Sequence, residues 1–521
     1  MRVRIPPLFP FLLASWPPLA LAARNPDSVY RVSHLAVPLL TAWLVTALGW
    51  LAARTAGLSS GKSRVTAALV ALSWWGFRVP VDLLQHSPIV HDIGVARWSG
   101  WIAVAALGGA GYLMIRRLPD GLGRASTFVN LVAVLLVGSA VVSLGRGWAQ
   151  AAAGAGSDRS PTTAGPLLES GRPDVYLVVL DAYSGARTLS GRYGFDNSTF
   201  LARLRARGFT LPRSVRSNYP HTHLALASLL NWNAVQAFEA DLTHDPKGHA
   251  RLKATLEDNP TWRYFARRGY RIAFYPSVRE ITGKNRYARE GFAEEPEDFP
   301  VAWQVMTPVP EARRAWRAAR GLVRGPDTAI PRAVRLNDRR FSELGRLHRP
   351  RRPVFAFAHL LLPHQPFVYH ADCRPRHPAV YPAFDRSVSD SGYVQGYLEQ
   401  LQCVNQRVLG VIDTILARSA ETPIILLLSD HGLGSRHFDI PALGEASPAL
   451  IDERLDGFAA VLVPDSVASS FRGDVTPTGV LRDLMRTVFG LALPSLDLPS
   501  YWSSSRRSYD FTLIDHPGSV P

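Results

Sequence analysis

A short, unbroken aliphatic run at residues 423–432 (PIILLLSDHG) constrains the fold of this 521-residue chain more than any other stretch. It is bounded by a proline and a glycine, which is typical of a strand buried on both faces of a parallel sheet. The run ends in Ser429, Asp430 and His431. A carboxylate and an imidazole there are costly unless paired or metal-bound, and ligands usually lie at the carboxyl edge of such a sheet. We therefore expect this strand to deliver metal ligands.

A second strand of the same kind lies upstream, at residues 175–180, and Asp181 follows its last residue. Two buried strands would each present an acid at the same edge of the sheet. The alternative is that either carboxylate only caps the turn or helix that follows it. The pair together favours a metal site over two unrelated caps.

The first 145 residues are far more apolar than the rest, and 521 residues are too many for one compact domain. Five apolar segments approach the length needed to cross a bilayer, namely residues 5–23, 35–53, 65–84, 98–115 and 128–144. A cleaved signal peptide is the alternative for the first segment, and buried helices of a soluble protein are the alternative for some others. We predict a membrane region at residues 1–145, a linker at 146–170 and a second domain at 171–521.

Basic residues predict the orientation of these spans. One set of loops carries most of them: Arg2, Arg4, Arg54, Lys62, Arg64, Arg116, Arg117 and Arg124. The opposite loops carry fewer, chiefly Arg24, Arg31 and Arg97. Because positive residues mark the cytoplasmic side, an odd number of spans places everything after residue 145 on the periplasmic or outer face of the plasma (inner) membrane.

The second domain alternates strand-like and helix-like segments from Asp174 onward. Further strands are expected at residues 354–360 and 458–463, and a long amphipathic helix at 393–416. This order predicts an α/β domain with a mixed, mostly parallel sheet between helices.

The formal net charge of +16 comes mainly from arginine, which suits anionic partners such as phospholipid headgroups, phosphates or acidic glycans. Nucleic acid is not expected, because zinc-finger spacings, ribonucleoprotein motifs and basic heptad helices are missing from the sequence. The arginine-rich run at 311–352 is either a solvated helix face or a surface on which Trp316 and Leu322 rest on anionic lipid. The sequence does not indicate an oligomeric state.

Cys373 and Cys403 are the two cysteines of the chain. In an oxidising compartment they form a plausible disulfide, and two buried thiols are the alternative.

A metal held by Asp181, Asp430 and His431 calls for a nucleophile. The best candidate is Thr222, which follows a Tyr-Pro turn and precedes an apolar helix. A hydroxyl at a helix amino terminus meets backbone amides and the positive end of the dipole, and coordination to a cation lowers its pKa. The alternative is that Thr222 only caps the helix.

The order of Asp181, Thr222 and the Ser-Asp-His-Gly run resembles the alkaline phosphatase superfamily. With five spans before an outer-face domain, the chain is similar to the sulfatase-like branch that contains lipoteichoic acid synthases and phosphoethanolamine transferases. The resemblance covers about residues 174–464 and the membrane layout. It implies that Asp181, Thr222, Asp430 and His431 surround one divalent ion and that Thr222 is the covalent nucleophile.

The resemblance also extends to the segment FAFAHLLLPHQPFVYH, in which His364 matches a substrate-binding histidine. His359 and His437 are further candidates for substrate binding, for a second metal or for a leaving-group acid; a structural role is the alternative for each histidine. True sulfatases use a cysteine in a Cys-x-Pro-Ser-Arg setting, which this chain lacks at Thr222, so sulfate-ester hydrolysis through formylglycine is not expected.

The expected function is therefore transfer or hydrolysis of a phospho (or sulfo) ester on an envelope lipid or glycan. Zinc and manganese suit this ligand set best, with magnesium or calcium as alternatives. The rival interpretation is a catalytically silent, membrane-anchored scaffold or binding protein of the cell envelope.

Overall fold

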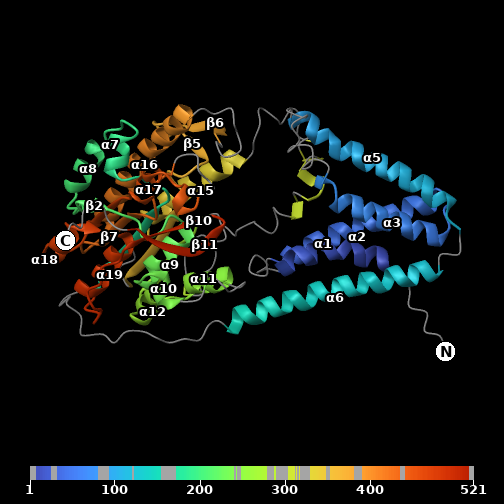
Figure 1. Ribbon diagram of the computed structural model, residues 1–521, viewed down its shortest axis with the longest axis horizontal. Coiled ribbons are helices and arrows are strands. Elements are labelled where there is room, and N and C mark those ends of the chain that lie inside the picture. The colour runs from blue at the N-terminus through green and yellow to red at the C-terminus, as the bar shows by residue number, and fades with distance from the viewer. Residues whose placement is uncertain are drawn as a thin grey trace. The chain divides into compact units, whose positions relative to one another are not determined.

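The structure, a computed structural model, describes residues 8–24, 32–79, 93–119, 123–153, 172–239, 242, 248–277, 285, 287–288, 303–304, 306–310, 312–313, 316, 329–347, 352–380, 390–434 and 440–514. The chain divides into two compact units. The first contains Met1–Gly154 together with Pro296–Arg324, and the second contains Ala155–Glu295 and Gly325–Pro521. Figure 1 labels the elements of both.

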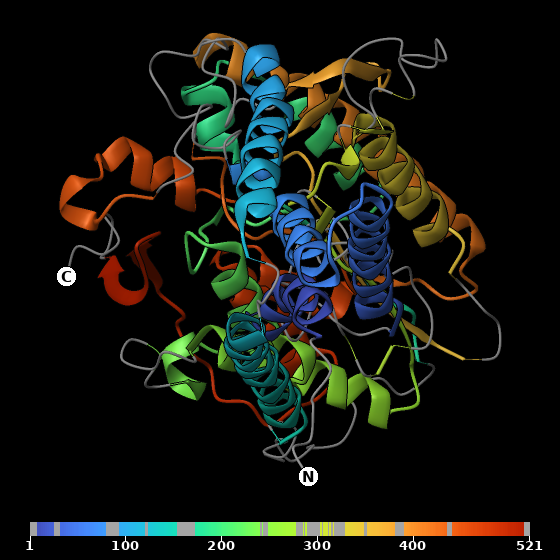
Figure 2. The same ribbon diagram turned by 90° about the vertical axis from the view of Figure 1, so that its right-hand side faces the viewer.

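The first unit is helical. Its helices are α1 (Phe9–Arg24), α2 (Val32–Thr55), α3 (Ser60–Trp75), α5 (Ile93–Arg117) and α6 (Gly123–Ala153). In Figure 2 these blue and teal helices are seen nearly along their axes. Each of the five predicted spans overlaps one of them. By length and composition, two described helices could cross a membrane, over Ser33–Thr55 and Gly123–Arg146.

Hydrogen bonds between helices fix the packing of this unit. The indole nitrogen of Trp75 donates to the carbonyl of Ala14 at 2.9 Å, and that of Trp43 donates to the hydroxyl of Ser15 at 2.8 Å. Small residues such as Ala14, which is fully buried, let the helix backbones approach closely. Helix α6 continues to Ala153, so the beginning of the expected linker is helical; residues 154–171 lie outside the described residues.

The second unit is an α/β domain with a mixed sheet. The five-stranded sheet has the order β3 (Arg271–Tyr275), β4 (Val354–Leu360), β1 (Val175–Leu180), β7 (Ile424–Ser429) and β8 (Ala459–Leu462). Neighbouring strands are parallel except β7 and β8, which are antiparallel. Every residue of β1, β4 and β7 is buried, because both faces of the sheet are covered. This explains their continuous aliphatic sequences.

The remaining elements surround this sheet. The helices are α7 (Ala186–Gly191), α8 (Ser198–Arg205), α9 (Thr222–Asn231), α10 (Val235–Phe238), α11 (Gly248–Glu257), α12 (Pro260–Arg267), α15 (Ala329–Leu344), α16 (Asp390–Arg418), α17 (Pro448–Leu455), α18 (Asp465–Ala468) and α19 (Pro477–Thr487). The small two-stranded sheets are β2 (Ser214–Val215) with β9 (Asp474–Val475), β5 (Phe367–Tyr369) with β6 (Pro375–Val380), and β10 (Ser500–Ser504) with β11 (Arg507–Ile514).

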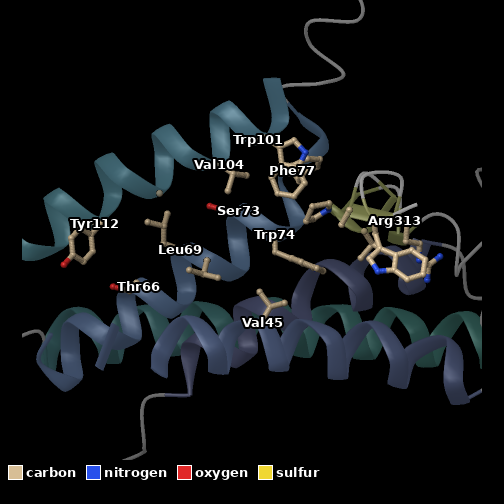
Figure 3. Close-up of a pocket in the computed structure, with 16 residues that line it drawn as sticks. Val45, Thr66, Leu69, Ser73, Trp74, Phe77, Trp101, Val104, Tyr112 and Arg313 are labelled. Atoms are coloured by element: carbon tan, nitrogen blue, oxygen red, sulfur yellow. The ribbon is translucent and has the colours of Figure 1, made fainter. Parts of the chain in front are cut away.

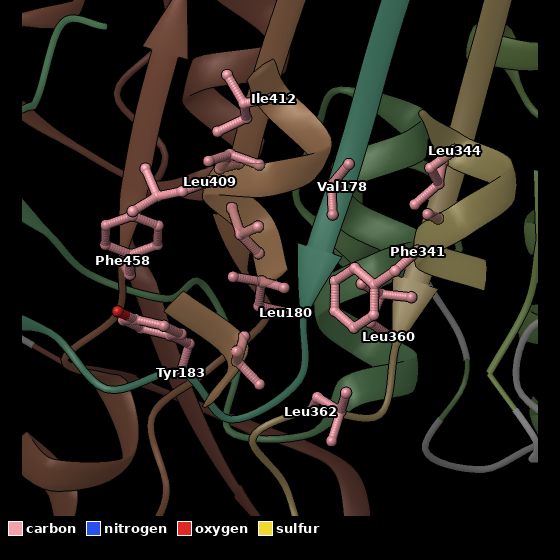
Figure 4. Packing of buried hydrophobic residues seen from close by; sticks show 14 of the residues in the cluster. Val178, Leu180, Tyr183, Phe341, Leu344, Leu360, Leu362, Leu409, Ile412 and Phe458 are labelled. Atoms are coloured by element: carbon pink, nitrogen blue, oxygen red, sulfur yellow. The ribbon is translucent and has the colours of Figure 1, made fainter. Parts of the chain in front are cut away.

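One face of the sheet packs against α15 and α16. Val178 and Leu180 of β1 belong to a buried cluster with Phe341 of α15 and Ile412 of α16 (Figure 4). A disulfide joins Cys373 to Cys403 of α16, with the two Cα atoms 4.9 Å apart.

The other face packs against α9, α12 and α19 around Trp262, whose side chain is fully buried. The Asn259 side chain caps α12 by accepting from the backbone N–H of Trp262. This fixes the indole against three aromatic rings of the sheet, Phe274, Phe355 and Phe357, at centroid distances of 5.4–5.7 Å.

We predict that Trp262→Ala lowers the free energy of unfolding by about 3–5 kcal/mol, because it leaves a large cavity in this aromatic cluster. Thermal unfolding of the full-length protein in detergent measures the effect. The matched control is Tyr264→Ala on the same helix, where the side chain is only half-buried and the loss should be clearly smaller. Equal losses at the two positions would contradict this account of the core.

Candidate functional site

The register of the sheet brings the two predicted acids together. In the parallel pairing of β1 with β7, Leu180 lies opposite Ser429, so Asp181 and Asp430 follow at the same level on the carboxyl edge. The ligand atoms of Asp181, Asp430 and His431 all lie within 4.8 Å of one another, and all three residues are buried. The described residues therefore contain a candidate metal site made by two strands that are far apart in the sequence.

The backbone around Asp181 is held on both sides. The carbonyl of Asp181 accepts from the backbone N–H of His364 at 3.1 Å, and the next residue, Ala182, adopts a left-handed conformation with φ of 60°. This conformation is unfavourable for a residue with a Cβ. It is stabilised because the Ala182 carbonyl accepts from the hydroxyl of Tyr397 and its N–H donates to Asp430 Oδ1 at 3.0 Å. The strained residue thus ties the two acids together.

The hydrogen bonds of Asp430 and His431 use one side-chain ligand atom of each residue and leave the other two, Asp430 Oδ2 and His431 Nε2, close to each other. Asp430 Oδ1 accepts from the N–H groups of Ala182 and His431, and His431 Nδ1 lies 2.8 Å from the carbonyl of Gly432. The latter contact places the imidazole proton on Nδ1 and leaves a lone pair on Nε2. That lone pair lies 3.2 Å from Asp430 Oδ2, so two electron-rich atoms face each other.

Unpaired buried oxygens are the clearest sign of a ligand here. Asp181 Oδ1 and Asp430 Oδ2 have no hydrogen-bond partner among the residues that the structure describes. Leaving buried carboxylate oxygens unpaired is costly, and a cation between them and His431 Nε2 would remove that cost. The residues therefore fit one divalent metal ion.

Gly432 is required by this arrangement. A Cβ on Gly432 would lie 2.1 Å from the backbone carbonyl oxygen of Glu453 and 2.7 Å from that of Asp456. The glycine thus lets the chain after His431 pass against the C-terminal end of α17 and the residue that follows it.

The charges of the site shift the pKa values of its members. Burial raises the pKa of Asp430 to about 6, and the nearby carboxylate of Asp181 adds to this rise. Burial also acts to raise the pKa of Asp181, but His364 and His359 outweigh it together and hold that pKa below its usual range. Burial, followed by the positive charge of Arg454, lowers the pKa of His431 well below its usual value. At neutral pH the imidazole is therefore uncharged, as a metal ligand must be.

Thr222 is the first residue of α9, and its Oγ1 lies 3.0 Å from His431 Nε2. The residue in the N-cap position is His221, whose side chain makes no capping hydrogen bond. The preceding turn is fixed because the hydroxyl of Ser217 donates to the carbonyls of Asp430 and Tyr219. The structure thus places the Thr222 hydroxyl beside the cluster of two carboxylates and one imidazole.

The three candidate histidines fall in different places. His359 of β4 is buried, with Nε2 3.3 Å from Asp181 Oδ2, and neither of its ring nitrogens has a hydrogen-bond partner among the described residues. His364 follows β4, is partly exposed, and has Nδ1 2.6 Å from the carbonyl of Gln365. His437 lies outside the described residues.

Arg454, at the end of α17, is a site residue that the sequence did not suggest. Its Nε donates to the carbonyl of Pro220, two residues before Thr222, and its Nη1 donates to the carbonyl of Leu433. Its Nη2 lies 3.2 Å from His431 Nε2. Two anchors on backbone thus direct a fixed positive charge at the cluster. The only sequence signal was its position a few residues before a strand, which many arginines share.

Comparison with known proteins gives structural neighbours only. No family model matches this chain, and neither does any curated protein. The neighbours are phosphoethanolamine transferases and sulfatases, which are enzymes of the sulfatase-like branch of the alkaline phosphatase superfamily.

Three of these solved structures illustrate the similarity. The periplasmic domain of EcEptC from Escherichia coli is 13% identical, with 68% of this chain and 96% of that chain covered and a TM-score of 0.43. The integral membrane lipooligosaccharide phosphoethanolamine transferase A (EptA) from Neisseria meningitidis is 14% identical over 91% of this chain and 92% of that chain, with a TM-score of 0.37. A putative sulfatase from Bacteroides thetaiotaomicron is 14% identical, with 62% of this chain and 72% of that chain covered and a TM-score of 0.38. Because these identities and TM-scores are low, we infer the function from the geometry of the site.

We predict that metal affinity falls as the pH is lowered through about 6. A bound cation requires Asp430 without its proton, and the pKa of that carboxyl is raised to about 6. Below this pH each unit should weaken zinc binding about tenfold, whereas above about pH 7 the affinity should level off. Calorimetric titration of the metal-stripped protein with zinc measures this. A constant affinity from about pH 5 to 7 would contradict the assignment of Asp430 as a ligand.

We also predict that Arg454→Met weakens binding of inorganic phosphate to the zinc-loaded protein by about tenfold or more, because a charge-assisted hydrogen bond is lost. Zinc content should be unchanged. The matched control is Arg192→Met, since Arg192 pairs with the adjacent Glu453. If Arg454→Met binds phosphate as tightly as the wild type, Arg454 does not face the ligand.

Proposed function

We propose that this protein is a membrane-anchored, metal-dependent enzyme that transfers or hydrolyses a phosphoester group through Thr222. The observation that carries the proposal is the Thr222 hydroxyl 3.0 Å from His431 Nε2, beside a buried Asp181–Asp430–His431 cluster with unpaired carboxylate oxygens. A nucleophile beside a cation site is the arrangement that phosphoester chemistry needs.

Asp181, Asp430, His431 and the hydroxyl of Thr222 would hold one divalent ion. When bound, such an ion lowers the pKa of a coordinated hydroxyl and neutralises negative charge on phosphoester oxygens. Zinc or manganese suits two carboxylates with one imidazole and a hydroxyl, and magnesium or calcium is an alternative.

The protein residues then have separate roles. Thr222 gives its proton to a water molecule, and its Oγ1 forms a bond to phosphorus as the bond to the leaving oxygen breaks, which gives a phosphothreonine and a leaving group. His364, partly exposed, binds the substrate and can protonate the leaving oxygen. Arg454, fixed by Pro220 and Leu433, contacts a non-bridging oxygen and stabilises its charge. Water or an acceptor hydroxyl then attacks phosphorus and regenerates Thr222.

The membrane assignment is part of the proposal. The predicted spans overlap five helices of the first unit, and the basic loops between them would face the cytoplasm. The catalytic unit then lies on the periplasmic side of the inner membrane, where the substrates would be envelope lipids or glycans. A silent scaffold is the weaker alternative, because an inert fold gains nothing from two buried carboxylate oxygens that have no hydrogen-bond partner among the described residues.

We predict a covalent adduct on Thr222. Full-length protein is incubated with divalent metal and total envelope phospholipid and measured by intact mass spectrometry. An adduct should form on the wild type and not on Thr222→Ala, because only the hydroxyl can attack. Its mass would identify the transferred group. Thr222→Ser, which keeps a hydroxyl, should retain a measurable fraction.

The outcomes separate the alternatives. An adduct on Thr222→Ala at the wild-type level would overturn the assignment of the nucleophile. A wild-type protein that is folded but takes up neither metal nor adduct would favour the silent scaffold.

A further inference from the structure

The helical unit contains a large cavity between α3 and α5. Its volume is about 730 Å³, and it is shown in Figure 3. Its lining comes from α2, α3, α5 and five residues of the segment Pro296–Arg324, which belongs to the same unit. Among the lining residues are Thr66, Phe77, Trp101, Gly108, Tyr112 and Arg313. The volume lies in the range typical of small-molecule sites, about 300–1,000 Å³.

The shape and chemistry of the cavity fit a hydrocarbon chain. The surface of the cavity is almost wholly apolar, so it would not hold ordered water. On α5 it extends from Trp101 to Tyr112, which is about 16 Å at a rise of about 1.5 Å per residue. This is close to half of the hydrocarbon core of a bilayer, about 30 Å thick, and so matches the depth of one leaflet.

One end of the cavity carries the residues that phospholipid headgroups prefer. Figure 3 shows Arg313 near Trp101 and Phe77, at the end opposite Thr66 and Tyr112. The guanidinium of Arg313 is exposed and donates to the side chain of Gln304. Arginine and tryptophan together are typical of the membrane–water interface. In the predicted orientation, this end lies at the outer leaflet.

We propose that this cavity binds one acyl chain of a membrane phospholipid, with the headgroup phosphate at Arg313. The inference rests on the membrane placement in the proposed function, since it requires the helical unit to lie in a bilayer. The lining comes from α2, α3, α5 and the residues Pro308, Val309, Ala312, Arg313 and Trp316, whereas none of the described lining comes from α6, where Leu131 and Leu135 belong to an exposed apolar face. The bound lipid is therefore held in a defined position.

Two adjacent glycines allow a matched test. Gly108 lines the cavity, and a Cβ there would meet no atom within 4 Å, so Gly108→Phe can fill the space without a clash at its first carbon. Gly109 also has no atom within 4 Å of a Cβ, but it is exposed and outside the lining. Gly109→Phe therefore adds the same side chain to the same helix turn while leaving the cavity open.

The experiment uses full-length protein in nanodiscs that contain a phosphatidylglycerol with a diazirine on one acyl chain. After irradiation, crosslinked peptides are quantified by mass spectrometry. Crosslinks to α3 and α5 should saturate at a low mole fraction of probe, and those to α6 should rise in proportion to it. Gly108→Phe should reduce the α3 and α5 crosslinks at least about fivefold, because the added ring occupies space that the acyl chain would fill and removes its packing contacts with the cavity wall.

In the same samples, crosslinks to α6 should not change, and Gly109→Phe should behave as the wild type. Arg313→Gln should shift the half-saturation of the α3 and α5 crosslinks to a higher probe fraction, by about threefold or more. Proportional, unsaturable crosslinking at α3 and α5, or no loss in Gly108→Phe, would overturn the proposal and leave only bulk lipid at this position. The readout needs neither metal nor turnover, so a failure of the proposed catalytic function would not affect it.

A final comparison separates a substrate lipid from a resident one. If the Thr222 adduct forms from the probe lipid, Gly108→Phe should slow its formation, whereas a resident lipid would be retained through purification and leave the adduct rate unchanged. The crosslinks decide whether the acyl-chain site exists, and this comparison decides only which of the two sources fills it.

Discussion

The parallel pairing of β1 with β7 is the interaction on which the site depends. It places Asp181 and Asp430 at one level of a fully buried sheet edge, where two like charges repel in a medium that screens them poorly. Burial and this repulsion raise the pKa of Asp430, whereas His364 and His359 hold the pKa of Asp181 below its usual range. A fold built only for stability would separate these acids or pair them with cations. The hydrogen bonds of Ala182 instead hold them together, which is the behaviour expected of a site that a cation completes.

The sheet could be predicted from the sequence because its signals are local. Unbroken aliphatic strands at 175–180 and 424–428 and the acids that follow them each lie within a few residues. The parallel order then makes their convergence a consequence of topology. The helices and strands expected at 393–416, 354–360 and 458–463 were found for the same reason, as α16, β4 and the region of β8. By contrast, the grouping of Pro296–Arg324 with the helical unit depends on contacts between distant segments, which no local pattern contains.

Arg454 is a site residue that could not be predicted from the sequence. Its role comes from three contacts, to Pro220, Leu433 and His431, that join two loops and a helix terminus. Nothing in the residues around it distinguishes it from the many solvated arginines of this chain. His359 is the opposite case, because its position in a buried strand could be predicted from the sequence, but its closeness to Asp181 Oδ2 could not. The position of a residue along a strand can be predicted from the sequence, whereas its contact with a residue that is distant in the sequence cannot.

The balance of charge suggests which phosphoester suits the site. Two ionised carboxylates would cancel a divalent cation, and His431 is neutral at pH 7 because its pKa is lowered. The guanidinium of Arg454 then adds a positive charge beside the Thr222 hydroxyl, since both groups lie close to His431 Nε2. A phosphodiester carries a single negative charge and would neutralise it, whereas a phosphomonoester at neutral pH carries close to two and would leave an excess in a buried setting. If the protein has the function that we propose, the charge of the metal ligands and Arg454 therefore favours a phosphodiester substrate, the class that includes phospholipid headgroups.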